Sequence, residues 1–238
     1  MSGSSKLLFP RALDALQAVY LNSSGGVTGG DAFDITATAR EGAHLAITTQ
    51  AAERVYRALP GETGHVDTRL TLEAGARLDW LPQETILFDG AALDRRLSVE
   101  MAGDARLLLC EPLIFGRAAM GESVTDLRHA DRIDIARAGR LVWSDRLRLN
   151  GDAAACLADP AIAEGARAMA TVVLAAPGAA AQVAPLRGML PETGGVSALD
   201  PDLLVLRLLA IDGFELRRHL CPILRRLSGA ELPRPWMI

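Results

Sequence analysis

The sequence has few of the residues on which most metal-binding and nucleophilic sites depend. Only three cysteines and four histidines occur in 238 residues. Cys110, Cys156 and Cys221 are odd in number and far apart, which argues against a disulfide framework and a structural zinc site. The histidines show neither HxH nor HExxH spacing, and no GxSxG motif is present. We therefore expect no catalytic residues and no permanently bound metal or cofactor.

Lysine and long apolar runs are equally scarce. Lys6 is the only lysine among 25 basic residues, and the formal net charge is −4. Without a basic stripe, nucleic acid and anionic membrane surfaces are not expected partners. No run reaches the roughly 18 apolar residues of a membrane-spanning helix, and the N-terminal segment lacks the apolar core of a signal peptide. The sequence therefore predicts a soluble, cytoplasmic protein.

Aromatic residues make up only 4% of the chain, although half of all residues are hydrophobic. The core should consequently consist of leucine, valine, isoleucine and alanine. The length is sufficient for one large domain with a sizeable core. No linker composition interrupts the chain, so we expect a single domain over residues 1–238.

Four segments share one pattern, in which an alternating strand, a glycine turn and a more apolar strand follow each other. The alternating strands are expected over 34–39, 67–73, 95–101 and 132–137. The turn glycines are Gly42, Gly75, Gly103 and Gly139. A strand–turn–strand unit that recurs at about this period is typical of stacked β architectures. The fold class predicted is mainly β, a β-helix-like stack, although the irregular spacing leaves open a plain β-sandwich whose hairpins happen to repeat.

The last third of the chain predicts about two helices. A weak helix is expected over 179–190, and 203–210 favours a strand between two turns. The clearest helix should begin at Asp212 as N-cap and end at Gly229, with a kink caused by Pro222. Its apolar face is expected to contain Phe214, Leu216, Leu220, Ile223, Leu224 and Leu227.

A glycine-rich segment, SSGGVTGGD, covers residues 23–31. Gly25 and Gly30 have the spacing of a Walker-type phosphate loop, but Asp31 stands where that loop needs lysine. A carboxylate at that position would repel phosphate oxygens. The alternative is a tight connection whose glycines adopt positive φ and whose turn is capped by Asp31.

Two carboxylates follow apolar runs. Glu111 lies between LLLC and Pro112, and Asp145 follows LVW, so both are expected at the ends of buried strands. A buried carboxylate costs several kcal/mol unless it is paired or metal-bound. Pairing with one of the many arginines is the structural explanation, and from spacing alone it is favoured.

Longer motifs bear a resemblance to a known family. In chain order they read NSSGGVTGGD, TTQAAERVYRA, WLPQETILFDGAALDRR, EPLIFGRAAMGE and LPRPWMI. They resemble the urease accessory protein D (UreD) family, also called the H protein in some bacteria. The resemblance extends from about Leu7 to Ile238, nearly the whole chain.

The resemblance implies a maturation factor and not an enzyme. Members of the family act with the F and G accessory proteins, G being a GTPase, to deliver nickel to the urease apoprotein. The family member binds urease and the F protein and serves as a scaffold or chaperone, with nickel only in transit. The family fold is described as a β-helix-like stack with two helices.

Carried over by position, the acidic residues of the family fall on Asp31, Glu111, Glu122 and Asp145. The resemblance implies that these acids line a polar passage for nickel. Carboxylates suit transfer because they release a divalent cation faster than thiolate or imidazole cages. Family members usually carry about thirty further residues before the segment around Lys6, so the first strands of the family are expected to be missing here, with an exposed edge.

Two alternatives are compatible with the residues themselves. One is a β-helix carbohydrate enzyme with paired carboxylates, although such enzymes usually need more aromatic residues than this chain has. The other is a structural β scaffold that never touches metal. The sequence does not separate this scaffold from a nickel conduit, because both need their acids paired.

Overall fold

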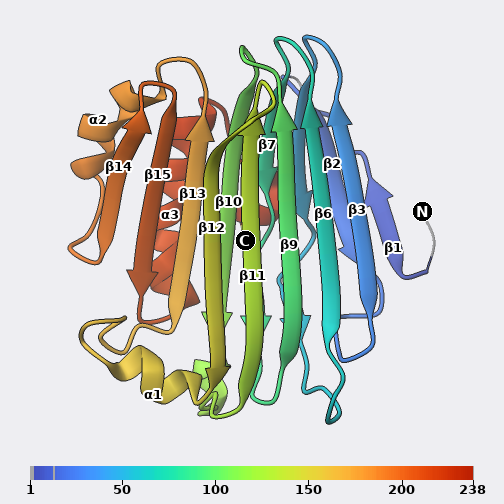
Figure 1. Ribbon diagram of the computed structural model, residues 1–238, viewed down its shortest axis with the longest axis vertical. Helices are drawn as coiled ribbons and strands as arrows, with labels where there is room; N and C mark the ends of the chain where they lie inside the picture. Colours follow the sequence, from blue (N-terminus) through green and yellow to red (C-terminus); the bar gives the residue numbers. More distant parts are fainter. Residues whose placement is uncertain (1–2, 13, 238) are drawn as a thin grey trace.

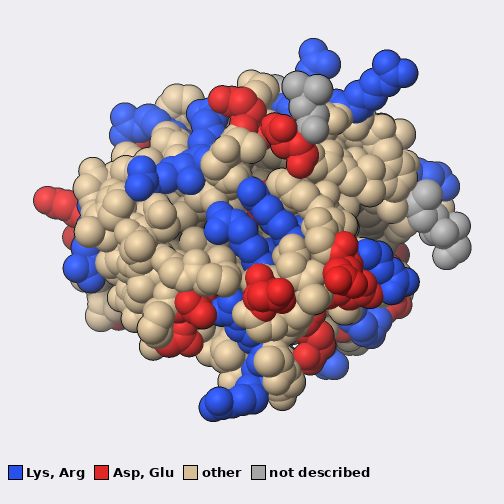
Figure 2. All heavy atoms as spheres, turned by 90° about the horizontal axis from the view of Figure 1, so that it is seen from above, with Lys and Arg blue, Asp and Glu red and all other residues tan. Residues whose placement is uncertain are grey.

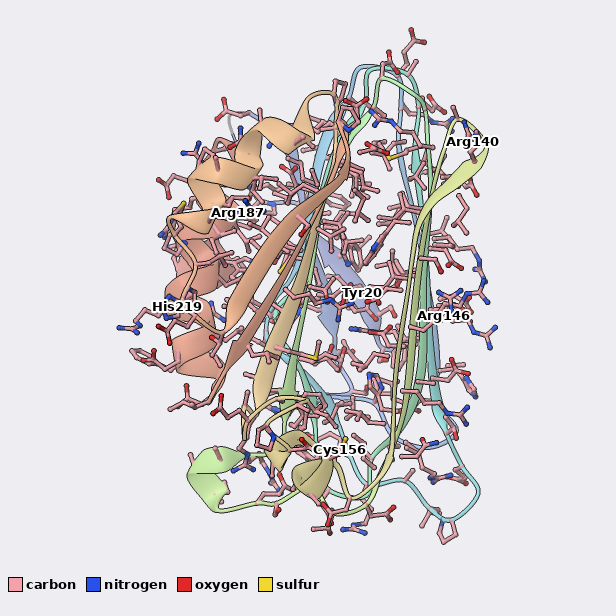
Figure 3. All side chains as sticks on the ribbon, turned by 60° about the vertical axis from the view of Figure 1, so that its left-hand side comes forward. Tyr20, Arg140, Arg146, Cys156, Arg187 and His219 are labelled. Atoms are coloured by element: carbon pink, nitrogen blue, oxygen red, sulfur yellow. The ribbon has the colours of Figure 1, made fainter. Side chains whose placement is uncertain are left out.

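The computed structural model describes residues 3–12 and 14–237, so Ile238 of the closing motif lies outside the described residues. Two β-sheets lie face to face, and helix α3 covers the outer face of the larger one (Figure 1). The larger sheet, sheet A, has ten strands, and the smaller sheet, sheet B, has five. Figure 3 shows the sheets nearly edge-on, with Tyr20 lying toward the space between them and His219 on the helical side.

Sheet A has the main order β1-β2-β4-β7-β10-β13-β15-β14, with β5 and β8 joined to β10. Its strands are β1 Ser5–Leu8, β2 Leu16–Asn22, β4 His44–Thr49, β5 Glu53–Val55, β7 Arg77–Leu81, β8 Thr85–Leu87, β10 Arg106–Phe115, β13 Ala168–Ala175, β14 Gly194–Asp200 and β15 Leu203–Ala210. Sheet B contains β3 Ala32–Ala39, β6 Gly64–Leu72, β9 Ala92–Met101, β11 Leu127–Arg137 and β12 Arg140–Gly151. The α-helices are α1 Ala153–Ala158, α2 Val183–Arg187 and α3 Gly213–Ser228.

The predicted strand–turn–strand units are present, and three of them are arches that cross from sheet B to sheet A. They connect β3 to β4, β6 to β7 and β9 to β10. Successive arches stack in parallel, because β3, β6, β9 and β11 pair in parallel within sheet B, as do β2, β4, β7 and β10 within sheet A. This arrangement confirms the mainly β, β-helix-like stack.

The fourth unit differs from the other three. Strands β11 and β12 form an antiparallel hairpin within sheet B, in which Arg137 pairs with Arg140 around Gly139. Beyond it, β13, β15 and β14 extend sheet A by antiparallel pairing. The stack of arches therefore ends in ordinary hairpin pairing, which also joins β1 to β2 at the other end of sheet A.

The helices agree with the sequence in most respects. The Asp212 carboxylate accepts a hydrogen bond from the Glu215 amide (2.9 Å), and Gly229 ends α3 with a φ of 63°. The expected helix near residue 180 is a 3-10 turn, Ala179–Gln182, followed by α2. The apolar face of α3 was predicted wrongly at Phe214, which is 76% exposed. It lies two positions before the buried Leu216, and at about 100° per residue this places it on the opposite side of the helix. Helix α1 was not predicted.

Sheet A is interrupted along one line, here called the crease. Strand β4 ends at Thr49 and the chain resumes as β5, while β7 ends at Leu81 and the chain resumes as β8. The next strand, β10, continues across this line, pairing with β7 up to Leu109 and with β8 from Leu113. Pro112 is tolerated in the middle of β10 because it lies beside the gap between β7 and β8, where no strand needs its missing N–H.

The expectation that Glu111 and Asp145 lie at the ends of strands was wrong. Glu111 lies in the middle of β10 and Asp145 in the middle of β12, so neither is at a strand end. Apolar side chains fill the space between the sheets on both sides of this level, and a third cluster lies between sheet A and α3. Glu111 therefore lies between apolar regions and not at their margin.

The surface shows mixed charge. Figure 2 looks onto the end of the molecule that is at the top of Figure 1, where basic and acidic side chains are interspersed. Within the described residues, no helix is both long and apolar enough to cross a membrane.

Candidate functional site

A buried charged cluster occupies the space between the sheets. Arg95 of β9 projects from sheet B, and its Nη1 lies 2.7 Å from Oε2 of Glu111 on sheet A. Its Nη2 lies 2.5 Å from Oδ2 of Asp131 on the neighbouring β11. Trp80 Nε1 donates a hydrogen bond to the other Glu111 oxygen (2.6 Å), and Arg95 Nη1 also donates to Thr85 Oγ1 (3.2 Å). The cluster carries two carboxylates against one guanidinium.

Burial and the charge of Arg95 shift the pKa values of the two carboxylates in opposite directions. Arg95, Glu111 and Asp131 are 9%, 6% and 8% exposed. Burial raises the pKa of Glu111, and the attraction of Arg95 with the Trp80 hydrogen bond only partly offsets this. Burial also opposes ionisation of Asp131, but the charge and hydrogen bond of Arg95, with smaller contributions from His129 and the Arg132 amide, together hold its pKa below the ordinary value. Asp131 is thus the firm ionic partner of Arg95.

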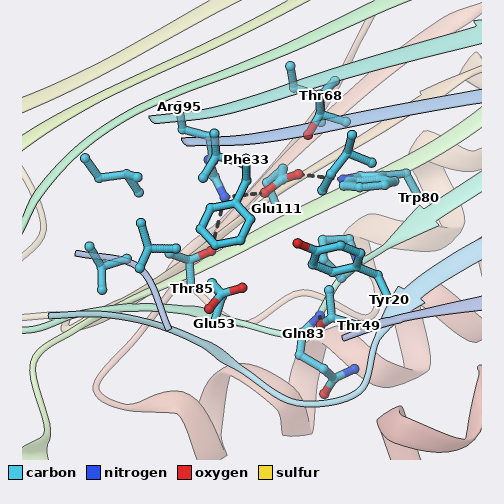
Figure 4. Close-up of a pocket in the computed structure, with 17 residues that line it drawn as sticks. Tyr20, Phe33, Thr49, Glu53, Thr68, Trp80, Gln83, Thr85, Arg95 and Glu111 are labelled. Atoms are coloured by element: carbon cyan, nitrogen blue, oxygen red, sulfur yellow. Dashed lines mark hydrogen bonds and ion pairs between the residues drawn. The ribbon is translucent and has the colours of Figure 1, made fainter. Parts of the chain in front are cut away.

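A cavity of about 70 Å³ adjoins this cluster. Arg95 and Glu111 form part of its wall, together with Tyr20, Thr49, Thr68 and Gln83 (Figure 4). A cavity of this size has room for about two water molecules, given roughly 30 Å³ of liquid volume for each, although apolar side chains such as Val27, Phe33 and Leu93 make up most of its wall. Gln83 is 4% exposed and its Oε1 accepts a hydrogen bond from Arg217 (2.8 Å), while its Nε2 has no hydrogen-bond partner among the described residues. The Gln83 amide is therefore directed toward α3, which covers the outer face of sheet A.

Glu53 reaches the same cavity from the crease, at the start of β5. Asn22 Nδ2 donates to its Oε1 (3.2 Å), and no arginine forms an ion pair with it among the described residues. Burial raises its pKa to about 7, more than the Asn22 hydrogen bond and the neighbouring Arg54 lower it. Glu53 is therefore the acid of this cavity whose charge changes near neutral pH.

A row of polar side chains continues from Glu111 to the far edge of the sandwich. Across sheet A, Glu111 pairs with Thr171, and Thr171 pairs with Arg207 on β15. Asp145 reaches Arg207 from sheet B, with Oδ2 lying 2.5 Å from Nη2. We call this set the polar layer; it comprises Arg95, Glu111, Asp131, Asp145, Thr171 and Arg207. The layer is fully buried at its centre and half-buried at the Asp145 edge.

The glycine segment forms a tight turn, as its second interpretation predicted. Asp31 accepts a hydrogen bond from the Thr28 amide (2.9 Å) and so caps the turn that leads into β3. Gly30 has a φ of 82°, which favours glycine, and a Cβ on Gly26 would lie only 2.4 Å from the Tyr56 ring. Asp31 lines the open side between β1, β2 and β3, away from the polar layer.

Glu122 likewise stabilises a local loop. Its carboxylate accepts hydrogen bonds from the Arg117 backbone and side chain, each at 2.9 Å, in the connection between β10 and β11. Arg117 lies over the Phe88 ring at 4.3 Å, which ties this connection to the loop after β8. The Arg117 hydrogen bonds lower the pKa of Glu122, so it stays ionised.

The four predicted acids consequently do not form one site. Glu111 and Asp145 belong to the polar layer, whereas Asp31 and Glu122 cap surface turns. Three of the four have an arginine partner, in line with the structural explanation. Within the described residues, no three His, Cys, Asp or Glu side chains are grouped so that they could hold a metal ion.

Sequence reasoning missed Arg95, Asp131 and Glu53. A signal for the first two was present, because strand alternation puts Arg95 on the same face as Leu97 and Val99. Asp131 shares a face with Ile133 and Ile135 in the same way. A charge on an otherwise apolar face of each of two neighbouring strands indicates a buried ion pair. Glu53 gave no such signal, because its environment depends on the crease.

Comparison with known proteins identifies the family. Residues 1–237 match the family described as UreD urease accessory protein. Proteins named urease accessory protein UreD from Ruegeria pomeroyi and Roseobacter denitrificans are 56% and 52% identical over the whole of this chain, which covers 93% and 87% of their lengths. A third, from a Ruegeria species, is 54% identical, with 82% of its length covered. The chain belongs to the UreD family of urease accessory proteins.

Proposed function

We propose that this protein is a urease maturation factor that, together with the F and G accessory proteins, delivers nickel to the urease apoprotein. Membership of the UreD family carries the proposal, because relatives that are 56% and 52% identical to this chain, and of which it covers 93% and 87%, are named urease accessory proteins. In this role the protein acts as a scaffold and conduit and holds nickel only in transit. An accessory role requires no catalytic residue of its own.

The chemistry of the polar layer supports passage of a cation through the sandwich. The space between two β-sheets is normally filled by apolar side chains, and here it contains Arg95, Glu111 and Asp131 beside a cavity large enough for water. Carboxylate oxygens exchange a divalent cation without the tight hold of thiolates. The net negative charge of two carboxylates against one guanidinium favours a cation over an anion at this level.

Of the four predicted acids, only two lie where the proposed passage for nickel would run. Glu111 and Asp145 lie in the polar layer, so they are the candidates for direct contact with nickel. Asp31 and Glu122 are held at surface turns by backbone amides, and in this proposal they contribute only where partners or nickel approach the loops. A metal-free scaffold remains the second candidate, because arginine pairing satisfies Glu111, Glu122 and Asp145 without any cation.

Urease made with and without this protein tests the function itself. Co-expression of urease with all accessory genes, or with this one left out, should give equally folded and assembled urease in both cases. Nickel content per urease active site should fall strongly only when this gene is missing. Normal nickel content and activity in its absence at ordinary nickel supply would contradict the proposal.

The amide variant Glu111→Gln separates a conduit from a metal-free scaffold. It removes one charge of the buried cluster but keeps an oxygen that can accept the Trp80 hydrogen bond. Glu100→Gln is the control, because Glu100 is an exposed acid on β9 of sheet B. Loss of nickel loading by Glu111→Gln with intact binding of the F protein supports the conduit. Nickel loading equal to that of the control supports the scaffold.

A further inference from the structure

Large apolar side chains are exposed at the end of the molecule that is at the bottom of Figure 1. They lie in three connections, between β10 and β11, between α1 and β13, and between β15 and α3. The side chains are Met120, Ile162, Ile211 and Phe214, and they are between 53% and 76% exposed. We call this set the apolar end. Exposed apolar side chains that are grouped on one surface indicate a contact with another molecule.

Arg167, which directly precedes β13, holds the three connections together. Its Nη2 donates a hydrogen bond to the Glu122 carbonyl in the first connection. Its backbone amide donates to the carbonyl of Ala210, the last residue of β15 (3.0 Å), and its own carbonyl accepts from Phe115 at the end of β10 (2.8 Å). The side chains of the apolar end are therefore carried by connections that are bonded to one another.

The first connection presents a short apolar turn with a fixed base. The 3-10 turn Ala118–Met120 contains no buried residue, and in Figure 3 it is the pale green helical segment at the lower left. Arg117 and Glu122 close its base through the two hydrogen bonds described above, and Gly121 ends it with a φ of 68°. A turn held in this way loses little conformational entropy on binding. Because it projects from the surface, it fits a recess in the other molecule.

The charges around the apolar end are predominantly acidic. Two exposed basic residues already have acidic partners, since Arg117 pairs with Glu122 (2.9 Å) and Arg218 with Glu215 (2.8 Å). Three further acids lie in the same connections and form no ion pair among the described residues; they are Asp159, Glu164 and Asp212. The surface that meets the apolar end should therefore carry basic side chains around its recess.

We infer that the apolar end is a docking surface for a partner protein that offers an apolar recess bordered by basic side chains. The inference rests on the proposed function, because a scaffold for nickel delivery has to hold other proteins. Met120 and Phe214 are its anchors, since they are the most exposed large apolar side chains of the set and methionine and phenylalanine are enriched at interfaces. An anionic membrane and a second copy of this chain are both disfavoured, because each would oppose negative charge to the three acids.

Binding of the purified full-length protein to the F accessory protein and, separately, to the urease apoprotein tests the inference. Met120→Ser and Phe214→Ser should each weaken binding of one of these probes by about tenfold or more. Leu141→Ser is the matched control, because Leu141 is 64% exposed in the β11–β12 hairpin at the opposite end of the sandwich. It should bind both probes as the wild type does. All three positions are exposed, so urea denaturation should show unchanged folding.

Charge reversal tests the basic border of the recess. Glu164→Lys should weaken binding of the same probe, and the loss should be larger at about 50 mM salt than at about 300 mM salt, because salt screens exposed charges. Glu41→Lys is its control, since Glu41 is an exposed acid in the turn before β4, at the other end of the molecule.

Several results would overturn the inference. One is that neither probe binds the wild type, and another is that Met120→Ser and Phe214→Ser bind both probes as tightly as Leu141→Ser. A wild-type dimer that these two variants dissociate would assign the apolar end to a second copy. Binding to vesicles of phosphatidylcholine and phosphatidylglycerol that the variants abolish would assign it to a membrane.

Urease nickel content, measured separately, keeps this inference distinct from the proposed function. If the protein is needed for urease nickel but the anchor variants bind like the control, only the docking surface is refuted. If the protein is dispensable for urease nickel but the anchor variants lose a probe, only the proposed function is refuted.

Discussion

Glu111 and Glu53 line the same cavity, but they illustrate opposite ways of keeping a carboxylate inside a protein. Glu111 lies at the buried centre, where Arg95 and Trp80 occupy both of its oxygens. Glu53 lies at the crease, where Asn22 donates the side-chain hydrogen bond and no arginine forms an ion pair with it among the described residues. The protein itself therefore balances the charge of Glu111, whereas the carboxylate of Glu53 is available to a proton or a cation.

The difference indicates a division of roles along the polar layer. A buried charge with a complete set of partners mainly holds the two sheets together, because removing any partner leaves the others uncompensated. An acid whose partners are incomplete can exchange them, which is what transfer of a cation requires. Variants at the centre should therefore affect folding first, and variants at the crease should affect binding and pH dependence first.

The largest loss of stability is expected when the buried ion pairs are removed by Arg95→Met. This change leaves Glu111 and Asp131 buried without their cation, which should cost roughly 3–5 kcal/mol of unfolding free energy at pH 7. Urea denaturation measures the loss. The deficit should shrink on acidification, because protonation removes the stranded negative charges.

Arg57→Met provides the control for that variant. Arg57 pairs with Asp89 at 2.5 Å, but its side chain is 65% exposed, so its loss should cost less than about 1 kcal/mol. If the two variants proved equally stable, the centre would not be the ionic connection between the sheets that the contacts indicate.

The next largest effect is expected on the pH dependence of the free energy of unfolding, through Glu53. Its pKa rises from 4.5 to about 7 on folding, so the folded state favours the protonated form. The contribution of this group to stability is full below pH 4.5 and is lost as pH rises through 7. Glu53→Gln should remove this loss and stabilise the protein above pH 7, by no more than about 3 kcal/mol.

Urea denaturation at pH 5 and pH 8 measures this effect. The variant and the wild-type protein should differ little at pH 5 and most at pH 8, while Glu41→Gln should follow the wild type at both. A Glu53→Gln variant that is less stable than wild type at pH 8 would show that the carboxylate has an ionic partner in solution.

Much of the fold could be predicted from the sequence because it depends on local pattern. The alternation of polar and apolar side chains predicted the strands of sheet B, and the glycines at Gly42 and Gly75 predicted the turns of two arches. The hairpin at Gly139 has the same local pattern as the arches, so the sequence did not distinguish it from them. Whether a turn joins two sheets or two neighbours depends on strand pairing far along the chain.

The candidate site was harder to predict from the sequence, because it also depends on strand pairing far along the chain. Glu111 was placed at a strand end because Pro112 usually stops a strand, and only the gap between β7 and β8 shows why it does not. The ion pair with Arg95 was detectable in principle from the face on which Arg95 lies. Glu53 depends on the crease, which forms from the breaks between β4 and β5 and between β7 and β8, two places that are far apart in sequence.

The smallest effect on stability, and the finest test of the comparison, is expected at the edge of the polar layer. Asp145 faces inward and pairs with Arg207, while Asp134 on the adjacent strand faces outward and pairs with Arg132 and Arg146. The two carboxylate side chains are equally accessible, at 21% and 20%. Asp145→Asn and Asp134→Asn should each cost less than about 1 kcal/mol, because both pairs are partly solvated.

Their effects on urease should nevertheless differ. If nickel passes along the polar layer, Asp145→Asn lowers nickel per urease active site while binding of the F protein and stability stay unchanged. Asp134→Asn should leave all three unaltered, because its carboxylate is on the other face of sheet B. Equal nickel content with both variants would mean that the Asp145 edge is only a structural ion pair, so that any route for nickel would have to leave the layer before reaching Arg207.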